Sequence, residues 1–86
     1  MKQTTEVLQN ETKKWLGKIR GKKIIPKENS KEVREQITNI KAYISDCKYF
    51  LDNGDLVRAF EAVIYAWAIL ETLERLHMIE DESKDS

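Results

Sequence analysis

One apolar repeat constrains the fold of this 86-residue chain more than any other feature. Six side chains recur at intervals of 4, 3, 4, 3 and 4 along it: Val33, Ile37, Ile40, Ile44, Cys47 and Leu51. This spacing places all six on one side of an α-helix, whereas a strand would alternate apolar and polar residues. The repeat therefore predicts an amphipathic helix over about residues 30–53. Asn29 and Glu32 have the spacing of a capping box at its start.

Short turn signals divide the rest of the chain. Asn53-Gly54 is suited to end the predicted helix in a left-handed conformation, and Asp55 can cap the next helix. So short a connection predicts an antiparallel hairpin with a helix over about residues 56–79. Residues 5–20 show a further helical pattern, and the isoleucines of the linker 21–27 are expected to pack on the core. We predict an all-α fold, an up-and-down three-helix bundle with a long hairpin of its second and third helices.

Composition sets the class of protein. With 41% hydrophobic and 35% charged residues, the chain has the balance of a globular protein, and we expect one domain over residues 1–79 followed by a polar, disordered tail over 80–86. The longest uncharged run, residues 62–70, is much shorter than the roughly 20 residues of a membrane span. The N-terminus lacks the apolar stretch of a signal peptide. These features predict a soluble, cytoplasmic protein that does not contact a membrane.

Residues able to carry catalysis are few. Cys47 is the one cysteine and His77 the one histidine, so a disulfide within the chain, a zinc site with paired thiolates and a pair of histidines are excluded. We expect Cys47 to act as a small apolar residue of the helix stripe and His77 to be partly buried near a helix end. The sequence predicts no metal, no cofactor and no enzymatic activity.

One polar cluster on the hairpin has two interpretations. Asp46 and Tyr65 lie at similar distances from Gly54, so a hydrogen bond between them would satisfy two half-buried groups. The alternative is a carboxylate–tyrosine pair that transfers a proton. The candidate structural or binding cluster comprises Asp46, Tyr49, Arg58, Glu61, Tyr65 and Glu71.

Charge is distributed unevenly along the chain. Residues 1–27 hold eight basic and two acidic residues, a net charge of +6, and residues 28–86 carry −6. The basic residues are candidates for binding an anion: Lys13, Lys14, Lys18, Arg20, Lys22 and Lys23. They are interpreted either as a solvated face that answers the acidic half of the chain or as contacts to the phosphates of a nucleic acid.

The pattern over roughly residues 40–79 resembles that of an archaeal family, domain-of-unknown-function family 357. The matching residues are Ala42, Tyr43, Asp46, Tyr49, Phe50, Leu51, Gly54, Asp55, Arg58, Ala59, Phe60, Glu61, Ala62, Tyr65, Ala66, Leu70 and Glu71. The resemblance implies an up-and-down three-helix bundle and no established activity, substrate or catalytic residue. Family members carry histidine and glycine where this chain has Trp67 and Ala68, which weakens any catalytic proposal at that position.

The predicted helix 56–79 is apolar on two stripes, more than a short first helix can cover. An uncovered apolar face on a small protein favours self-association, and a homodimer is the commonest form. Our leading hypothesis is therefore a non-enzymatic helical module that binds proteins, itself included. The alternative is an accessory protein that binds nucleic acid or nucleotides through the basic N-terminal segment.

Overall fold

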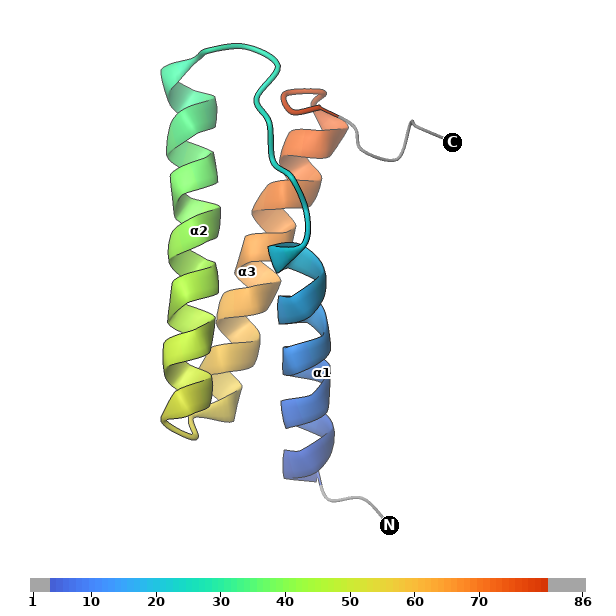
Figure 1. Ribbon diagram of the computed structural model, residues 1–86, viewed down its shortest axis with the longest axis vertical. Helices are drawn as coiled ribbons and strands as arrows, with labels where there is room; N and C mark the ends of the chain where they lie inside the picture. The colour runs from blue at the N-terminus through green and yellow to red at the C-terminus, as the bar shows by residue number, and fades with distance from the viewer. Residues whose placement is uncertain (1–3, 81–86) are drawn as a thin grey trace.

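Three helices run up, down and up along the long axis of the molecule (Figure 1). The computed structural model describes residues 4–80, in which α1 spans Thr4–Arg20, α2 spans Lys31–Asp52 and α3 spans Leu56–Arg75. Extended pairing within this range is limited to one bridge between Pro26 and Ile79. The prediction of an all-α up-and-down bundle is therefore confirmed. None of the helices in the described range is long and apolar enough to cross a membrane.

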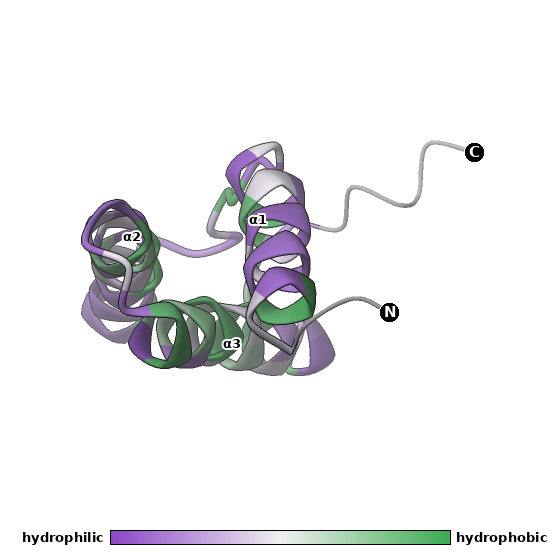
Figure 2. Cartoon of the chain, turned by 90° about the horizontal axis from the view of Figure 1, so that it is seen from below, coloured by the Kyte–Doolittle hydropathy of each residue, from purple (hydrophilic) through white to green (hydrophobic). Residues whose placement is uncertain are grey.

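Helix α3 organises the other two. Seen end-on, α3 lies between α1 and α2, which turn their apolar faces toward it and touch each other little (Figure 2). This arrangement follows from the sequence of α3, which is apolar on two sides and packs against both α1 and α2. Both partners of α3 come from the same chain, and α1 buries the side of α3 that the short first helix was expected to leave uncovered. That expectation is wrong.

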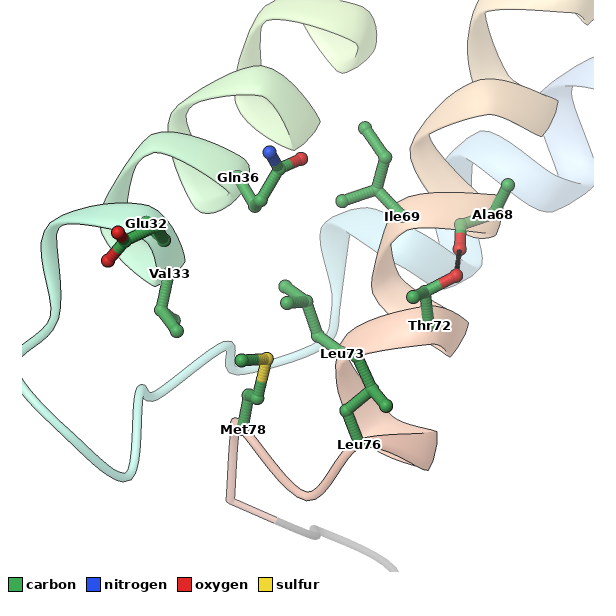
Figure 3. A pocket seen from close by; sticks show the side chains of 9 residues that line it. All are labelled: Glu32, Val33, Gln36, Ala68, Ile69, Thr72, Leu73, Leu76 and Met78. Carbon is green, nitrogen blue, oxygen red and sulfur yellow. Dashed lines mark hydrogen bonds between the residues drawn. The ribbon is translucent and has the colours of Figure 1, made fainter.

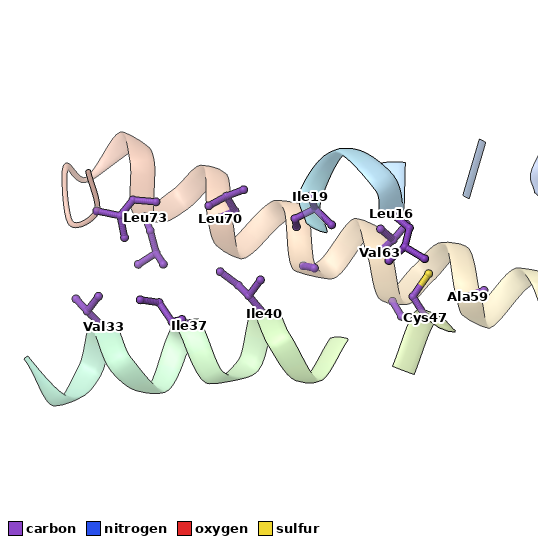
Figure 4. Packing of buried hydrophobic residues seen from close by; sticks show 13 residues of the cluster. Leu16, Ile19, Val33, Ile37, Ile40, Cys47, Ala59, Val63, Leu70 and Leu73 are labelled. Carbon is purple, nitrogen blue, oxygen red and sulfur yellow. The ribbon is translucent and has the colours of Figure 1, made fainter. Parts of the chain in front are cut away.

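The core follows the predicted repeat. Val33, Ile37, Ile40 and Cys47 are buried on α2, while Ile44 and Leu51 are half-buried. Figure 4 shows the first three facing Leu70 and Leu73 of α3, with Leu16 and Ile19 of α1 close to Val63. Burial raises the pKa of the Cys47 thiol, because the charged thiolate would lose its hydration there. The prediction that Cys47 acts as a core residue is confirmed.

The start of α2 is one residue later than predicted. Ser30, not Asn29, is the N-cap, and its hydroxyl accepts a hydrogen bond from the backbone N–H of Val33 at 3.1 Å. Asn29 instead accepts a hydrogen bond from the guanidinium of Arg34. Serine and asparagine cap helices about equally well, so the sequence alone did not decide between these neighbours.

The predicted turn between α2 and α3 is confirmed. Gly54 has a φ of 76°, and the backbone N–H groups of Gly54 and Asp55 donate to the carbonyls of Leu51 and Phe50 at 3.1 and 2.9 Å. These two bonds form a Schellman motif, which satisfies carbonyls left over at the end of a helix. The Asp55 carboxylate then accepts from the backbone N–H of Arg58 at the start of α3.

The prediction that the third helix reaches Ile79 is wrong. Helix α3 ends at Arg75, and a second Schellman motif follows, in which the N–H groups of His77 and Met78 donate to the carbonyls of Glu74 and Leu73 at 3.0 and 2.9 Å. His77 occupies the left-handed position with a φ of 57°. It is exposed rather than partly buried, so that expectation is also wrong.

The segment after α3 turns back onto the linker that precedes α2. The N–H of Lys27 donates to the carbonyl of Met78 at 3.0 Å, and the N–H of Glu80 donates to that of Ile25 at 2.8 Å. Ile79 is thereby buried in the core. Of the two linker isoleucines expected to pack on the core, Ile24 does so, but Ile25 is exposed, so the expectation is wrong for Ile25. Glu80, expected in the disordered tail, is held by this bond. The rest of that predicted tail lies outside the described residues.

Candidate functional site

The side of α3 that neither α1 nor α2 covers is the starting point for a functional site. Its residues recur at intervals of 4, 3, 4, 3 and 4, and all six are exposed: Val57, Glu61, Ile64, Ala68, Glu71 and Arg75. We call these six residues the outer face of α3. Val57 and Ile64 are 65% and 40% exposed, so the face presents apolar side chains to solvent between its charges.

A groove opens between α2 and α3 next to this face (Figure 3). The volume of this α2–α3 groove is about 310 Å³, and its lining is almost entirely apolar. In Figure 3 the side chains of Val33, Leu73 and Met78 point into it, and Glu32 and Gln36 form its polar edge on α2. The Schellman motif at the end of α3 places Met78 there, so the early end of the helix helps to build the groove. The remaining lining residues are Ala68, Ile69, Thr72 and Leu76.

A second groove lies on the opposite side of α3, against α1. Its volume is about 230 Å³, and it is lined by Trp15, Ile64, Trp67, Ala68 and Glu71. The two tryptophan rings meet edge to face with their centroids 5.6 Å apart, and the indole N–H of Trp67 donates to the backbone carbonyl of Trp15 at 3.1 Å. We call this the tryptophan groove. Ala68 lines both grooves, so they form one surface that continues across α3.

Three of the six predicted anion-binding residues gather at the tryptophan pair. The ammonium groups of Lys14 and Lys18 lie 5.6 and 4.7 Å from the centroid of the Trp15 ring, and that of Lys22 lies 5.7 Å from the Trp67 ring. Their spacing of four residues places them on one side of α1 and its continuation. Lys22 also forms an ion pair with Glu74 at 3.7 Å, which links the basic and acidic parts of the chain.

The other three predicted anion-binding residues are not among those that lie beside the tryptophans. Lys13 and Arg20 are exposed and seven residues apart, so they share a different side of α1 from Lys14 and Lys18. Lys23 is exposed in the linker. The structure therefore divides one basic segment into three lysines beside the tryptophans, Lys13 and Arg20 on another side of α1, and Lys23 in the linker.

The predicted hydrogen bond between Asp46 and Tyr65 is not formed. Both side chains are exposed, and the ring of Tyr65 instead packs against Tyr43, with centroids 5.4 Å apart. Equal distance from the turn sets two residues at one height along the hairpin, but it does not fix the side of each helix on which they lie. Three residues before Asp46, Tyr43 is on the side of α2 that reaches Tyr65. No proton-transfer pair is therefore assembled between Asp46 and Tyr65.

The remaining members of that predicted cluster have separate neighbours. Tyr49 packs against Phe50 with centroids 5.5 Å apart, and the guanidinium of Arg58 lies 6.0 Å from the Phe50 ring and 3.6 Å from Asp55. Glu61 belongs to the outer face of α3, and Glu71 lines the tryptophan groove. In the described range, no three histidine, cysteine, aspartate or glutamate side chains come close enough together to hold a metal ion.

The comparison with protein families identifies the family of the chain. A family model described as "Protein of unknown function (DUF357)" matches residues 10–79, nearly the whole described range. The chain belongs to the DUF357 family. The resemblance seen in the hairpin thus extends into α1. No curated protein matches the chain.

A solved DUF357 structure shares this fold. The crystal structure of protein AF1782 from Archaeoglobus fulgidus is 44% identical in sequence and superposes with a TM-score of 0.78. The match covers 92% of this chain and 99% of that protein. No activity is assigned to the family or to this structure.

Proposed function

We propose that this DUF357 protein is a non-enzymatic helical interaction module that binds other proteins through α3. The first partner that we propose is a second copy of the chain. The observation that carries the proposal is the apolar area exposed between the charges of the outer face of α3: the two grooves that meet at Ala68, together with Val57 and Ile64. Contiguous exposed apolar area is a common mark of an interaction site on a small protein. Tyr65 and Leu76, which are 51% and 59% exposed, enlarge the surface on the α2 side.

Sedimentation equilibrium at micromolar concentration tests self-association directly. We expect about twice the chain mass of 10.1 kDa. The dimer should persist when salt is added, because apolar contacts are not screened. A protein that stays monomeric up to about 100 µM would contradict the proposal, since a cellular homodimer usually associates well below that concentration.

The tryptophan groove favours one second candidate, binding of a nucleic acid. The ammonium groups of Lys14 and Lys18 lie over the half-buried ring of Trp15, and cations beside aromatic rings are typical of surfaces that hold single-stranded nucleic acids. The acidic residues around them, Glu11, Glu71 and Glu74, act against this candidate because they repel phosphates.

Filter binding to short single-stranded RNA and DNA separates the two candidates. The interaction module should bind no tighter than the non-specific range of about 10⁻⁴–10⁻⁶ M. Tight binding that is lost when Lys14 and Lys18 become alanine would favour the second candidate. The matched control replaces Lys31 and Lys48, two exposed lysines of α2, with alanine and should leave any such binding intact.

A further inference from the structure

The outer face of α3 is complementary to itself when a second copy is turned around. Glu61 and Arg75 lie seven residues before and after Ala68, which is about 10 Å along the helix in each direction. We propose that a second copy of the chain docks antiparallel on this face, with the two-fold axis beside Ala68. The proposal rests on the proposed self-association and deepens it by naming the surface, the direction and the register.

The charges of the outer face distinguish this register from its alternatives. With the axis beside Ala68, Glu61 of each copy stands level with Arg75 of the other, which gives two pairs of opposite charge. A parallel arrangement would set Glu61 against Glu61 and Arg75 against Arg75. Moving the antiparallel axis to the level between Ile64 and Ala68 would set Glu61 against Glu71. Like charges placed opposite each other disfavour both alternatives.

The shape of the face agrees with the same register. Ala68 is the smallest side chain on it and lies at its middle, so two helices can approach closely there. A two-fold axis perpendicular to α3 keeps the α2 sides of the two copies together. Tyr65, which contacts Tyr43 and so lies on the α2 side, would be carried to the level of residue 71 in its partner. The α2–α3 groove includes that level, because its lining on this side of the groove runs from Ala68 and Ile69 to Leu76 (Figure 3).

A second copy also fits the chemistry of the face better than other occupants. The face mixes apolar side chains with Glu61, Glu71 and Arg75, so it lacks the excess of positive charge that a phosphate backbone requires. The polar, acidic residues at the end of the chain do not suit an apolar groove. An exposed tyrosine on the same side as an open groove gives each copy both the projecting group and the site that receives it.

Cysteine cross-linking tests the position of the axis. Cys47 is fully buried, so the variant Ala68→Cys carries one accessible thiol. A disulfide needs two Cα atoms about 4.4–6.8 Å apart, which only a residue beside the axis satisfies in both copies at once. We expect Ala68→Cys to form a covalent dimer under mild oxidation at micromolar concentration. The matched control Glu35→Cys, exposed on α2, should remain uncross-linked.

Charge reversal tests the register independently. Glu61→Lys and Arg75→Glu should each weaken the dimer by about tenfold at low salt, because every reversal acts twice in a symmetric dimer. Combining the two reversals in one chain should restore association to near the original value. Glu35→Lys is the control and should leave the dissociation constant unchanged.

The outcomes separate this proposal from the one on which it rests. If neither charge reversal changes the dissociation constant and Ala68→Cys does not cross-link, the proposed face and register are wrong, although self-association itself stands. A wild-type chain that is monomeric throughout the concentration range would overturn both. Cross-linking equal in Ala68→Cys and Glu35→Cys would show random collision and would also overturn the register.

Discussion

The hydrogen bond from Trp67 to the carbonyl of Trp15 joins residues 52 positions apart and ties α1 to α3. Trp67→Phe removes the donor and part of the edge-to-face contact. A hydrogen bond of this kind contributes about 0.5–1.5 kcal/mol, and an aromatic pair adds a similar amount that phenylalanine partly retains. We therefore expect a loss of about 1–2.5 kcal/mol in the free energy of unfolding. For a domain of this size that corresponds to roughly 4–8 °C in Tm per kcal/mol.

Chemical denaturation followed by circular dichroism, at one fixed protein concentration, measures this loss. Trp15→Phe is the matched control, because Trp67 donates to the backbone of residue 15 and that bond survives the substitution. The indole N–H of Trp15 donates only to Glu11, one turn earlier in the same helix, at 3.3 Å. Each variant replaces one indole of the pair with a phenyl ring and removes one hydrogen bond, within α1 for Trp15→Phe and between α1 and α3 for Trp67→Phe. A larger loss in Trp67→Phe therefore reports the bond between the helices. Equal losses, within about 0.3 kcal/mol, would show that this bond does not hold α1 in place.

Three further predictions concern stability. Ile40→Ala, at a fully buried position, should lower the free energy of unfolding by about 2–5 kcal/mol. Ile25→Ala, at a position that is 47% exposed, should lower it by less than about 1 kcal/mol. Similar losses in the two variants would show that the repeat on α2 is not the core. Gly17→Ala should stabilise α1 by about 0.5–1 kcal/mol, because the added Cβ would meet open space. Gly54→Ala should destabilise the protein by about 1–2 kcal/mol, because residue 54 has a positive φ. Thermal denaturation checks the sign of both changes. The unfolded chain releases the Cys47 proton near its ordinary pKa while the core retains it, so stability should be intact below about pH 8.5 and fall as pH rises above it. In Cys47→Ala this part of the pH dependence should be absent, and a slope unchanged from wild type would contradict the assignment.

The fold was predictable because its strongest signals are local. The repeat on α2 and the turn at Gly54 each depend on residues close together in sequence, and both are confirmed. The end of α3 was not predictable in the same way. Residues 76–79 continue the apolar pattern of α3, yet the helix ends before them and His77 has a positive φ. The residues after His77 form hydrogen bonds with the linker before α2, which is some fifty positions earlier in the chain. A tertiary interaction thus overrides a helical pattern that nothing in the local sequence interrupts.

The candidate site was only partly predictable for a related reason. The excess of basic residues near the N-terminus pointed to the lysines beside Trp15, but the pairing of Trp15 with Trp67 depends on how α1 packs on α3. The outer face of α3 was not predicted as a site, because Glu61, Glu71 and Arg75 interrupt its apolar residues. The burial of Thr12 was not predicted either, because threonine is polar. Thr12 is fully buried, and its hydroxyl donates to the carbonyl of Leu8 at 2.7 Å. A satisfied hydroxyl behaves in the core much as a small apolar group does.

The central position of α3 separates two roles that usually compete for the same residues. Its inward sides hold the core, as fully buried Val63 shows, and the next residue along the chain, Ile64, is 40% exposed on the outer face. Because successive residues of a helix point about 100° apart, a substitution at one of these positions acts on folding and a substitution at its neighbour acts on association. The α2–α3 groove follows the same logic. Its floor, Leu73, is a core residue, while Leu76, on its lining, is 59% exposed. A partner that fills the groove therefore rests directly on the core, so binding at this surface and the stability of the bundle are coupled through α3.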